Sequence, residues 1–387
     1  MTFLLSINFI ESDKFYQGEY YYLLLSSLLG ALVVSSSRDL LTIFIGIELA
    51  STPMFLLSGW KKGDRKSNEG AIKFFLLGVL SASLILYGFS LIYGLTGQLV
   101  FADISAYLLA NSLGSSPVLL LSAILVISGI GFKISVVPFH SWAPDTYEGA
   151  PLPITAYLSV SSKATGFVAL IVLLTKVFES SGQSWGVILA IVAGATMTLG
   201  NLVALQQTNP VRLLAYSSIS QAGFIIAPLA VSGITGNYQD GIFASVTYLI
   251  IYAFMNIGAF LSVHLFTNFT KSDNFYEWGG IAKHSPLTGV LTTVFFFSLA
   301  GIPPLGGWFA KFVVFRSLLS TGEIIGISLA IVGAINAVIA LVYYARISKV
   351  IWMDELKNPE EEKSFEFQSP LKVVGALTVL ITFVAGI

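Results

Sequence analysis

Eleven long apolar stretches run through the chain, and they restrict its fold more than any other feature. A stretch of roughly 20 apolar residues can span the hydrocarbon core of a bilayer as a helix, because a helix satisfies its backbone groups internally. The sequence therefore predicts an all-α integral membrane protein with about eleven transmembrane helices. They are placed at 20–36, 39–59, 70–94, 117–147, 152–175, 185–206, 210–231, 239–266, 286–320, 324–350 and 370–387.

Composition narrows the class of protein further. Charged residues make up 11% of the chain, against about 25% in soluble proteins. The absence of cysteine excludes disulfides and metal-thiolate clusters, and the presence of only three histidines disfavours a haem site. We therefore expect no metal and no cofactor in this chain, so that another subunit carries any electrons. The first residues do not resemble a cleaved signal peptide.

The basic residues predict the orientation. Under alternating crossings, thirteen lysines and arginines fall on one side and three on the other. By the positive-inside rule, the amino terminus faces the cytoplasm or its organellar equivalent. The richer side holds Lys14, Lys61, Lys62, Arg65, Lys66, Arg212, Lys271, Lys283, Arg346, Lys349, Lys357, Lys363 and Lys372, and the other side holds Arg38, Lys176 and Arg316.

Four lysines remain inside the apolar stretches. Lys73 lies near the basic side and one helical turn after Glu69, so an ion pair between them explains it. Lys133, Lys163 and Lys311 lie deep in their segments. A lysine at the centre of a membrane helix costs roughly 2.5–3.5 kcal/mol on insertion scales, and such residues usually serve a function.

Glu48 is the one carboxylate near the middle of a predicted span. An ion pair between Glu48 and one lysine that locks two helices together is the structural alternative, and it leaves two lysines without a partner. Buried charge pairs often fail to stabilise a protein relative to apolar replacements. We therefore favour a functional role for Glu48 and the three deep lysines.

Two predicted spans are too long for one straight crossing, and each is interrupted beside its lysine. In 117–147, Pro138 follows Lys133; in 286–320, Pro303 and Pro304 precede Lys311. Proline breaks helical hydrogen bonding, and freed backbone groups at membrane depth persist only where protein or water satisfies them. These broken helices therefore indicate a hydrated interior.

The positions of the breaks predict two inverted repeats. The first ten spans form two sets of five, and each broken span is the fourth of its set. Discontinuous helices at matching positions of inverted repeats mark a transport site. The predicted regions are an N-terminal segment on the cytoplasmic side at 1–19, a first repeat at 20–177, a second at 184–352, a cytoplasmic-side loop at 353–369 and a final helix at 370–387.

Other polar groups suit a relay between the lysines. His140 follows the first break, and its imidazole titrates near neutrality, although a structural histidine at a helix break is equally plausible. Ser217, Ser218 and Gln221 lie in the second span of the second set and offer hydroxyls and an amide. They predict a hydrogen-bonded path between the two repeats.

Asp145 and Glu148 lie at the end of the first broken span, on either side of its last residue. They are candidates for an entrance to the path, and helix capping and turn formation explain them equally well.

These groups suit proton movement. A lysine kept from water loses its proton more readily than one in water, and a nearby ionised glutamate favours the protonated form. Driving one charge against 100 mV needs about 2.3 kcal/mol, which a swing of roughly two pKa units supplies. Small movements of the helices that separate Glu48 from a lysine are therefore sufficient to drive the transfer.

Four long motifs resemble the antiporter-like membrane subunits of NADH:quinone oxidoreductase, respiratory complex I, and in particular subunit N. They are IFIGIELAS, GFKISVVPFHSWAPDTYEGAPLPITAYLSVSSKATGF, NPVRLLAYSSISQAGF and GIPPLGGWFAKF. The resemblance covers nearly the whole chain. Bacterial members usually have three further helices ahead of the span equivalent to 20–36, and many carry histidine at the position of Gln221, which does not titrate.

The resemblance implies proton translocation driven by quinone reduction in other subunits, by a chain that is a non-redox part of the enzyme. Glu48 and Lys133 then belong to the first half-channel, Lys163 leads to the central axis, and Lys311 belongs to the second half-channel. NADH, FMN, iron-sulfur clusters and quinone are expected in partner subunits, and the chain in a bacterial plasma membrane or mitochondrial inner membrane. The alternatives are a subunit of a multisubunit Na+/H+ antiporter without redox chemistry, and a membrane scaffold locked by its lysines.

Overall fold

The computed structural model describes residues 1–11, 18–355 and 369–386, and these residues are helical almost throughout. Eight of the described helices are long and apolar enough to cross a membrane, and shorter apolar helices accompany them. The prediction of an all-α membrane protein is confirmed. The helices are α1 (Thr2–Glu11), α2 (Glu19–Ser36), α3 (Leu40–Ser58), α4 (Arg65–Thr96), α5 (Phe101–Ala110), α6 (Pro117–Lys133), α7 (Trp142–Gly149), α8 (Leu152–Tyr157), α9 (Lys163–Lys176), α10 (Gly182–Ala204), α11 (Pro210–Thr235), α12 (Tyr238–Thr270), α13 (Ile281–His284), α14 (Pro286–Ala300), α15 (Gly306–Leu319), α16 (Ile324–Met353) and α17 (Ser369–Val384).

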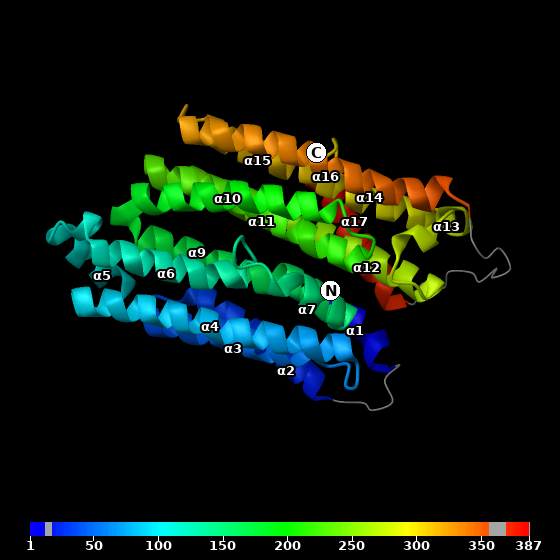
Figure 1. Cartoon of the computed structure of the whole chain (residues 1–387), viewed down its shortest axis with the longest axis horizontal. Helices are drawn as coiled ribbons and strands as arrows, with labels where there is room; N and C mark the ends of the chain where they lie inside the picture. The colour runs from blue at the N-terminus through cyan, green and yellow to red at the C-terminus, as the bar shows by residue number, and fades with distance from the viewer. Residues whose placement is uncertain (12–17, 356–368, 387) are drawn as a thin grey trace.

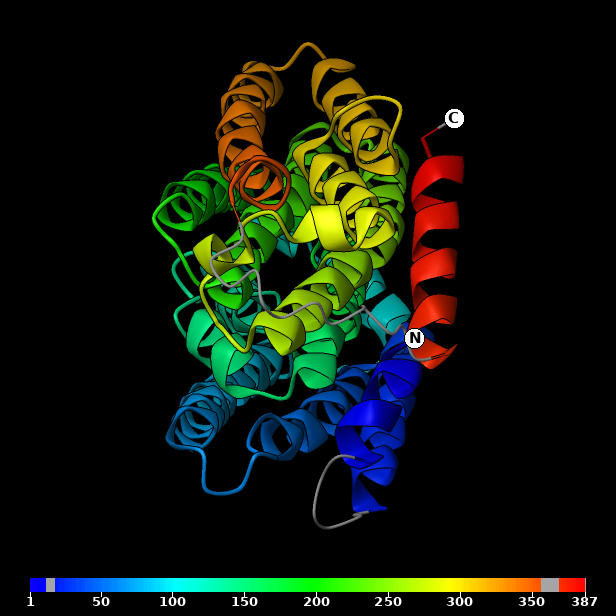
Figure 2. The ribbon, with the colours of Figure 1, turned by 90° about the vertical axis from the view of Figure 1, so that its right-hand side faces the viewer.

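The long helices lie side by side along one axis (Figure 1). The early helices α2, α3, α4 and α6 occupy one part of the bundle, and α10, α14, α15 and α16 occupy the opposite part. In the view down the bundle, α17 stands at the edge, close to α1 (Figure 2). Helix α1 falls in the predicted N-terminal segment and packs against α8 with Leu5 buried. Most of the predicted loop at 353–369 lies outside the described residues.

Two of the predicted spans are interrupted, and a third contains a π-helical turn. The span 117–147 becomes α6 and α7, which flank a first break at residues 134–141, and 286–320 becomes α14 and α15, which flank a second break at residues 301–305. Each break contains a cis peptide, before Pro138 and before Pro304. The span 152–175 contains a π-helical turn, η2 (Leu158–Ser162), directly before Lys163. Sequence reasoning missed this turn, whose wider winding is common at functional sites.

Polar side chains set the starts of the helices that carry the candidate site. Asp39 caps α3 by accepting a hydrogen bond from the Thr42 amide at 2.8 Å. Asn209 caps α11 by accepting from the Val211 amide at 2.8 Å, and Pro210 occupies the first helical position. Both arrangements satisfy amides that have no partner within the helix. They fix the positions of Glu48 on α3 and of the polar residues on α11.

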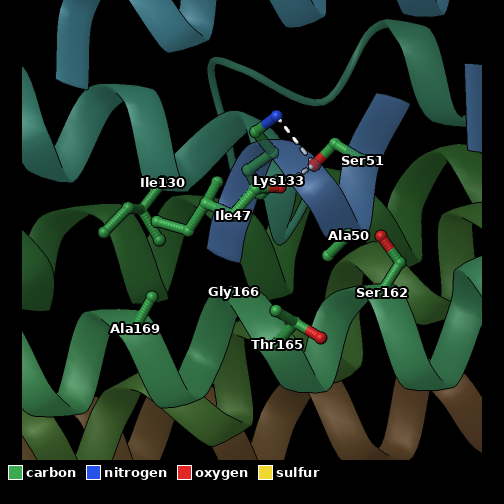
Figure 3. Close-up of a pocket in the computed structure, with 9 residues that line it drawn as sticks. All are labelled: Ile47, Ala50, Ser51, Ile130, Lys133, Ser162, Thr165, Gly166 and Ala169. Atoms are coloured by element: carbon green, nitrogen blue, oxygen red, sulfur yellow. Dashed lines mark hydrogen bonds between the residues drawn. The ribbon is translucent and has the colours of Figure 1, made fainter. Parts of the chain in front are cut away.

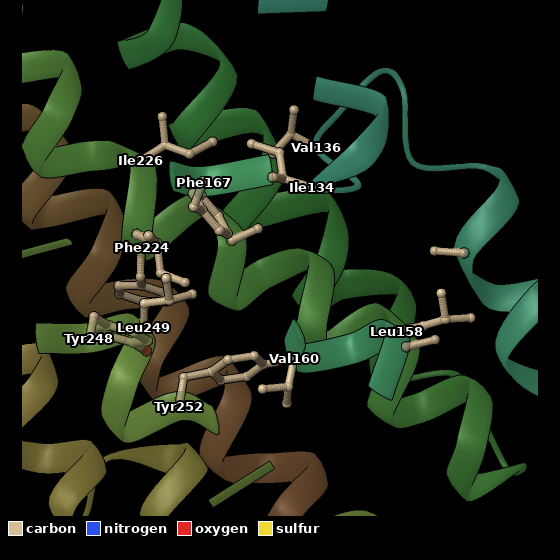
Figure 4. Packing of buried hydrophobic residues seen from close by; sticks show 14 of the residues in the cluster. Ile134, Val136, Leu158, Val160, Phe167, Phe224, Ile226, Tyr248, Leu249 and Tyr252 are labelled. Carbon is tan, nitrogen blue, oxygen red and sulfur yellow. The ribbon is translucent and has the colours of Figure 1, made fainter. Parts of the chain in front are cut away.

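Apolar packing fills the region between the early and late helices (Figure 4). Phe167 of α9 and Phe224 of α11 are fully buried there. Ile134 and Val136, from the first break, are buried in the same cluster. The apolar side chains keep lipid and bulk water away from the polar groups that cross the bundle.

Candidate functional site

Lys133 is the last residue of α6 and pairs with the carboxylate predicted for it. Its Nζ lies 3.3 Å from Glu48 Oε1 and donates to Ser51 Oγ at 2.9 Å. The Lys133 side chain is 6% exposed, whereas the Glu48 side chain is 28% exposed. The Phe55 ring lies 5.6 Å from the ammonium and adds a cation-π contact. The ammonium also occupies the C-terminal end of α6, which favours positive charge.

A small cavity of about 10 Å³ adjoins this pair (Figure 3). That volume holds about one water molecule. Lys133 and Ser51 line one side, and Ser162 and Thr165, around the start of α9, line the other. Lys133, Ser51, Ser162 and Thr165 are the polar side chains among the residues that line it. The cavity thus lies between Lys133 and the start of α9.

Lys163 is buried on α9 and contacts the late helices. Its Nζ donates to the Ser218 carbonyl at 2.9 Å and to Ser218 Oγ at 2.7 Å. It forms no ion pair with a described residue. Lys163 therefore contacts a polar residue of α11 directly.

Lys311 is held by the backbone that the second break leaves free. Its Nζ donates to the Leu299 carbonyl at 3.1 Å and to the Ala300 carbonyl at 2.5 Å. The last carbonyls of a helix lack partners within it, and the break after Ala300 makes these two available. Gly301 begins the break at φ +94°, and a β-carbon there would lie 2.7 Å from Lys311 Cδ.

Gln221 connects α11 to the Lys311 site. Its Nε2 donates to the Leu299 carbonyl at 3.2 Å, so Gln221 and Lys311 share an acceptor. The Tyr248 hydroxyl donates to Gln221 Oε1. Ser217 hydrogen-bonds to the Tyr344 hydroxyl on α16. Gln221 is 1% exposed, so these partners take the place of water around its amide.

Sequence reasoning missed the tyrosines around this polar stretch. Tyr248 and Tyr252 lie four residues apart on α12 and are buried, as are Tyr343 and Tyr344 on α16. The spacing of Tyr248 and Tyr252 places both on one face of a helix, which is a signal present in the sequence. A buried tyrosine usually finds a hydrogen-bond partner, so such a face predicts a polar contact.

His140, the remaining predicted relay residue, does not contact the lysines through a hydrogen bond between described residues. His140 is half-buried within the first break. No hydrogen bond between its ring and Lys133 or Lys163 is found among the described residues. Pro138 lies in the first break, and Pro303 and Pro304 lie in the second, at the predicted positions. Among the described residues, no group of three histidine, aspartate or glutamate side chains is placed to bind a metal.

Asp145 and Glu148 form ion pairs at the basic end of the bundle. Lys73 pairs with Glu69, as the sequence predicts, and also with Asp145 Oδ2, both at 2.7 Å. Lys66 Nζ lies 2.7 Å from Glu148 Oε1, and Arg212 contacts both carboxylates of α7. The long-range pairs were missed because the partners are separated by more than 60 residues of sequence.

The geometry separates two kinds of lysine. Lys133 has a counter-ion, whereas the hydrogen bonds of Lys163 and Lys311 go to hydroxyl and carbonyl oxygens of described residues. The Phe224 ring also lies 5.3 Å from the Lys311 Nζ. A buried ammonium without a counter-ion is costly, whereas a neutral amine is a polar group that these hydrogen bonds can satisfy. An ion-pair lock accounts for Lys133 only.

Known proteins resemble the chain over its full length. A chain named NAD(P)H-quinone oxidoreductase subunit 2 from Crocosphaera subtropica is 40% identical over 396 aligned residues, which cover 100% of this chain and 74% of that protein. A chain named NADH-quinone oxidoreductase subunit N from Moorella thermoacetica is 38% identical and covers 100% of this chain and 79% of its own.

A solved structure shows the same fold. A chain in the respiratory complex I structure from Thermus thermophilus with bound aureothin superimposes with a TM-score of 0.78 and 29% identity. The superposition covers 97% of this chain and 79% of that one. The profile of the family described as "NADH:quinone oxidoreductase/Mrp antiporter, TM" matches residues 37–339. The chain therefore belongs to the NADH:quinone oxidoreductase/Mrp antiporter transmembrane family.

Proposed function

We propose that the chain is a proton-translocating membrane subunit of a complex I type NADH:quinone oxidoreductase. Its own residues carry protons, and quinone reduction in other subunits supplies the free energy. The observation that supports this most is the succession of three buried lysines across the bundle. Lys133 contacts Glu48, Lys163 contacts Ser218, and Lys311 contacts a carbonyl shared with Gln221.

The path has three parts in this proposal. Glu48 and Lys133 form the first, and the cavity lined by Ser51, Ser162 and Thr165 takes a water molecule toward α9. Lys163 and Ser218 form the second. Movements that change the distance between Glu48 and Lys133 alter how well the carboxylate stabilises the ammonium, because the interaction of two charges depends on their separation.

The third part leads from Ser218 to Lys311. Gln221 lies three residues after Ser218 on α11, so the two side chains are neighbours on one helical face. The amide of Gln221 does not titrate. In this proposal its hydrogen bonds to Tyr248 and the Leu299 carbonyl keep α11, α12 and the end of α14 in position. The proton then passes beside it, through hydroxyls and water molecules.

The remaining assignments follow from the same proposal. NADH, FMN, iron-sulfur clusters and quinone bind to partner subunits, and the chain itself carries no redox centre. The complex resides in an energy-coupling membrane. The basic end, with Lys66 and Arg212, faces the cytoplasm or its organellar equivalent, in line with the positive-inside rule.

The alternative is a subunit of a Na+/H+ antiporter without redox chemistry, which the family description also includes. Purified complex in proteoliposomes separates the two. We expect proton transport that starts with NADH or its equivalent and quinone, and stops with a quinone-site inhibitor. Transport driven by a sodium gradient alone, and insensitive to that inhibitor, would establish the antiporter instead. Mass spectrometry of the co-purifying chains provides an independent answer, because complex I brings iron-sulfur subunits with it.

A further inference from the structure

An arginine of the second set of helices reaches across the bundle to α7, the half-helix after the first break. Arg212, in the first turn of α11, donates from Nη1 to Asp145 Oδ1 at 2.9 Å and to Glu148 Oε2 at 2.8 Å. We call Arg212, Asp145 and Glu148 the arginine clamp. Hydrogen bonds between a guanidinium and two carboxylates are stronger than those between neutral groups and are directional.

On its other side, α7 is tightly joined to α4. A β-carbon at Gly149 would lie 2.4 Å from the Lys66 carbonyl, and one at Gly70 would lie 2.8 Å from the Asp145 carbonyl. Thr146 Oγ1 also donates to the Gly70 carbonyl at 3.1 Å. Helices in such close contact move together. The arginine clamp therefore ties the α4–α7 unit, and not α7 alone, to α11.

The same half-helix reaches the candidate proton path. Tyr147 of α7 is buried, and its hydroxyl lies near Ser218 without a hydrogen bond of good geometry. Ser218 is the residue that accepts both hydrogen bonds from Lys163. It follows Arg212 by six residues on α11, a rise of about 9 Å. The clamp thus holds α7 against α11 less than two turns from the Lys163 contact.

The charged groups of the clamp are suited to holding α7 against α11 and not to passing protons. Burial raises the pKa of Glu148, but the hydrogen bonds from Lys66 and Arg212 outweigh this effect and keep the pKa below its ordinary value. A carboxylate that stays ionised does not pick up protons near neutral pH. The Glu148 and Arg212 side chains are 17% and 28% exposed, so solvent only partly screens the pair.

We propose that the arginine clamp is a positioning device, in which Arg212 sets the placement of α7, and with it the Tyr147 hydroxyl, relative to the contact between Lys163 and Ser218. This inference rests on the proposed proton-transfer role of Lys163. Loss of the clamp lets α7 shift along α11, which changes the surroundings of Ser218 while leaving the Lys163 side chain in place. The clamp therefore governs how efficiently protons cross between the two sets of helices.

The test uses the intact complex in proteoliposomes and measures protons moved per electron, together with the pH profile of proton uptake. We expect Arg212→Gln to lower the ratio about threefold to tenfold, a range typical of residues that modulate coupling. The Arg212→Lys variant retains one ion pair and should recover part of the ratio. Lys66→Gln is the matched control: it removes another partner of Glu148 but leaves α11 attached, so the ratio should stay at the wild-type value.

A second variant keeps the inference testable if Arg212→Gln fails to assemble. The triple variant Arg212→Gln, Asp145→Asn, Glu148→Gln removes the clamp without leaving an unpaired buried charge. The exposed Lys66 and Lys73 each lose one partner as well. We expect it to assemble, to have a low ratio and to shift the pH profile. A wild-type ratio and pH profile in this variant would overturn the inference. Lys163→Met, measured beside it, distinguishes the two failures: a normal ratio in Lys163→Met would instead refute the proposed function.

Discussion

The two breaks hold their lysines by different means. At the first break, Lys133 ends the helix before the interruption and pairs with Glu48 from another helix. At the second, Lys311 lies in the helix after the interruption and donates to carbonyls of the helix before it. The comparison teaches that Lys133 depends on a neighbouring helix for its partner, whereas Lys311 depends on the shape of its own broken helix. In the proposed path, the two lysines would then respond to different movements.

The largest expected effect comes from removing the lysine of the second break. Lys311→Met keeps the apolar stem and removes the amine, and no ion pair with a described residue is lost with it. We expect the complex to assemble with its electron transfer intact and its proton transport reduced by at least about 100-fold, the lower end of the roughly 10²–10⁴-fold contribution of general acid-base groups. Acidification of the medium around proteoliposomes measures this. Full transport in Lys311→Met would show that the second lysine is structural.

A smaller effect is expected from the shape of the second break. Gly301 has φ +94°, and a β-carbon there would meet Lys311 Cδ at 2.7 Å. Gly301→Ala should cost about 1–3 kcal/mol of backbone strain and displace Lys311, with proton transport falling several-fold. Gly94→Ala is the control, because a β-carbon there meets open space. Equal transport in both variants would remove the link between break geometry and Lys311.

At the first break, we expect loss of the ion pair between Glu48 and Lys133 to lower the stability of the complex. Glu48→Gln leaves the Lys133 ammonium without its counter-ion, which costs about 3–5 kcal/mol in a fully buried pair and less here, because Glu48 is 28% exposed. Thermal inactivation of the solubilised complex should therefore begin at a lower temperature. The double variant Glu48→Gln, Lys133→Met should regain most of the loss, since it removes the unpaired charge. Additive losses in the double variant would show that the two side chains do not interact.

The smallest effect concerns backbone tolerance at the first break. Ser135 occupies a left-handed conformation with φ +58°. Glycine adopts such angles without steric cost, so Ser135→Gly should change stability by less than about 1 kcal/mol and leave transport unchanged. The same thermal inactivation assay measures it. A several-fold loss of transport would mean that the Ser135 hydroxyl, and not the backbone, matters at this break.

Much of the fold follows from the sequence. Apolar length predicts the spans, because backbone groups in lipid leave few other solutions, and prolines beside Lys133 and Lys311 predict both breaks. The π-helical turn before Lys163 has no such signal in residues 158–162. Within this turn, Ser159 accepts a hydrogen bond from Asn256 of α12, a contact between segments far apart in the sequence.

The contact partners of the candidate site residues were harder to predict from the sequence. The deep lysines and Glu48 are visible as charges in apolar stretches, but the acceptors of Lys311 are backbone carbonyls, which no residue type reveals. Ser218 was singled out as a polar group, yet its contact with Lys163 spans 55 residues of sequence. Such contacts are set by how the helices pack, and a single sequence predicts that only coarsely.

The central claim is that protons pass through the buried lysines of this chain, and Lys163 is the most direct place to test it. In the proposed path it joins the two halves, and it has no ion pair with a described residue whose loss would confuse the result. The measurement is the number of protons moved per electron by the reconstituted complex with Lys163→Met, beside the wild type. We predict a clearly lower ratio at an unchanged amount of assembled complex. An unchanged ratio would contradict the account.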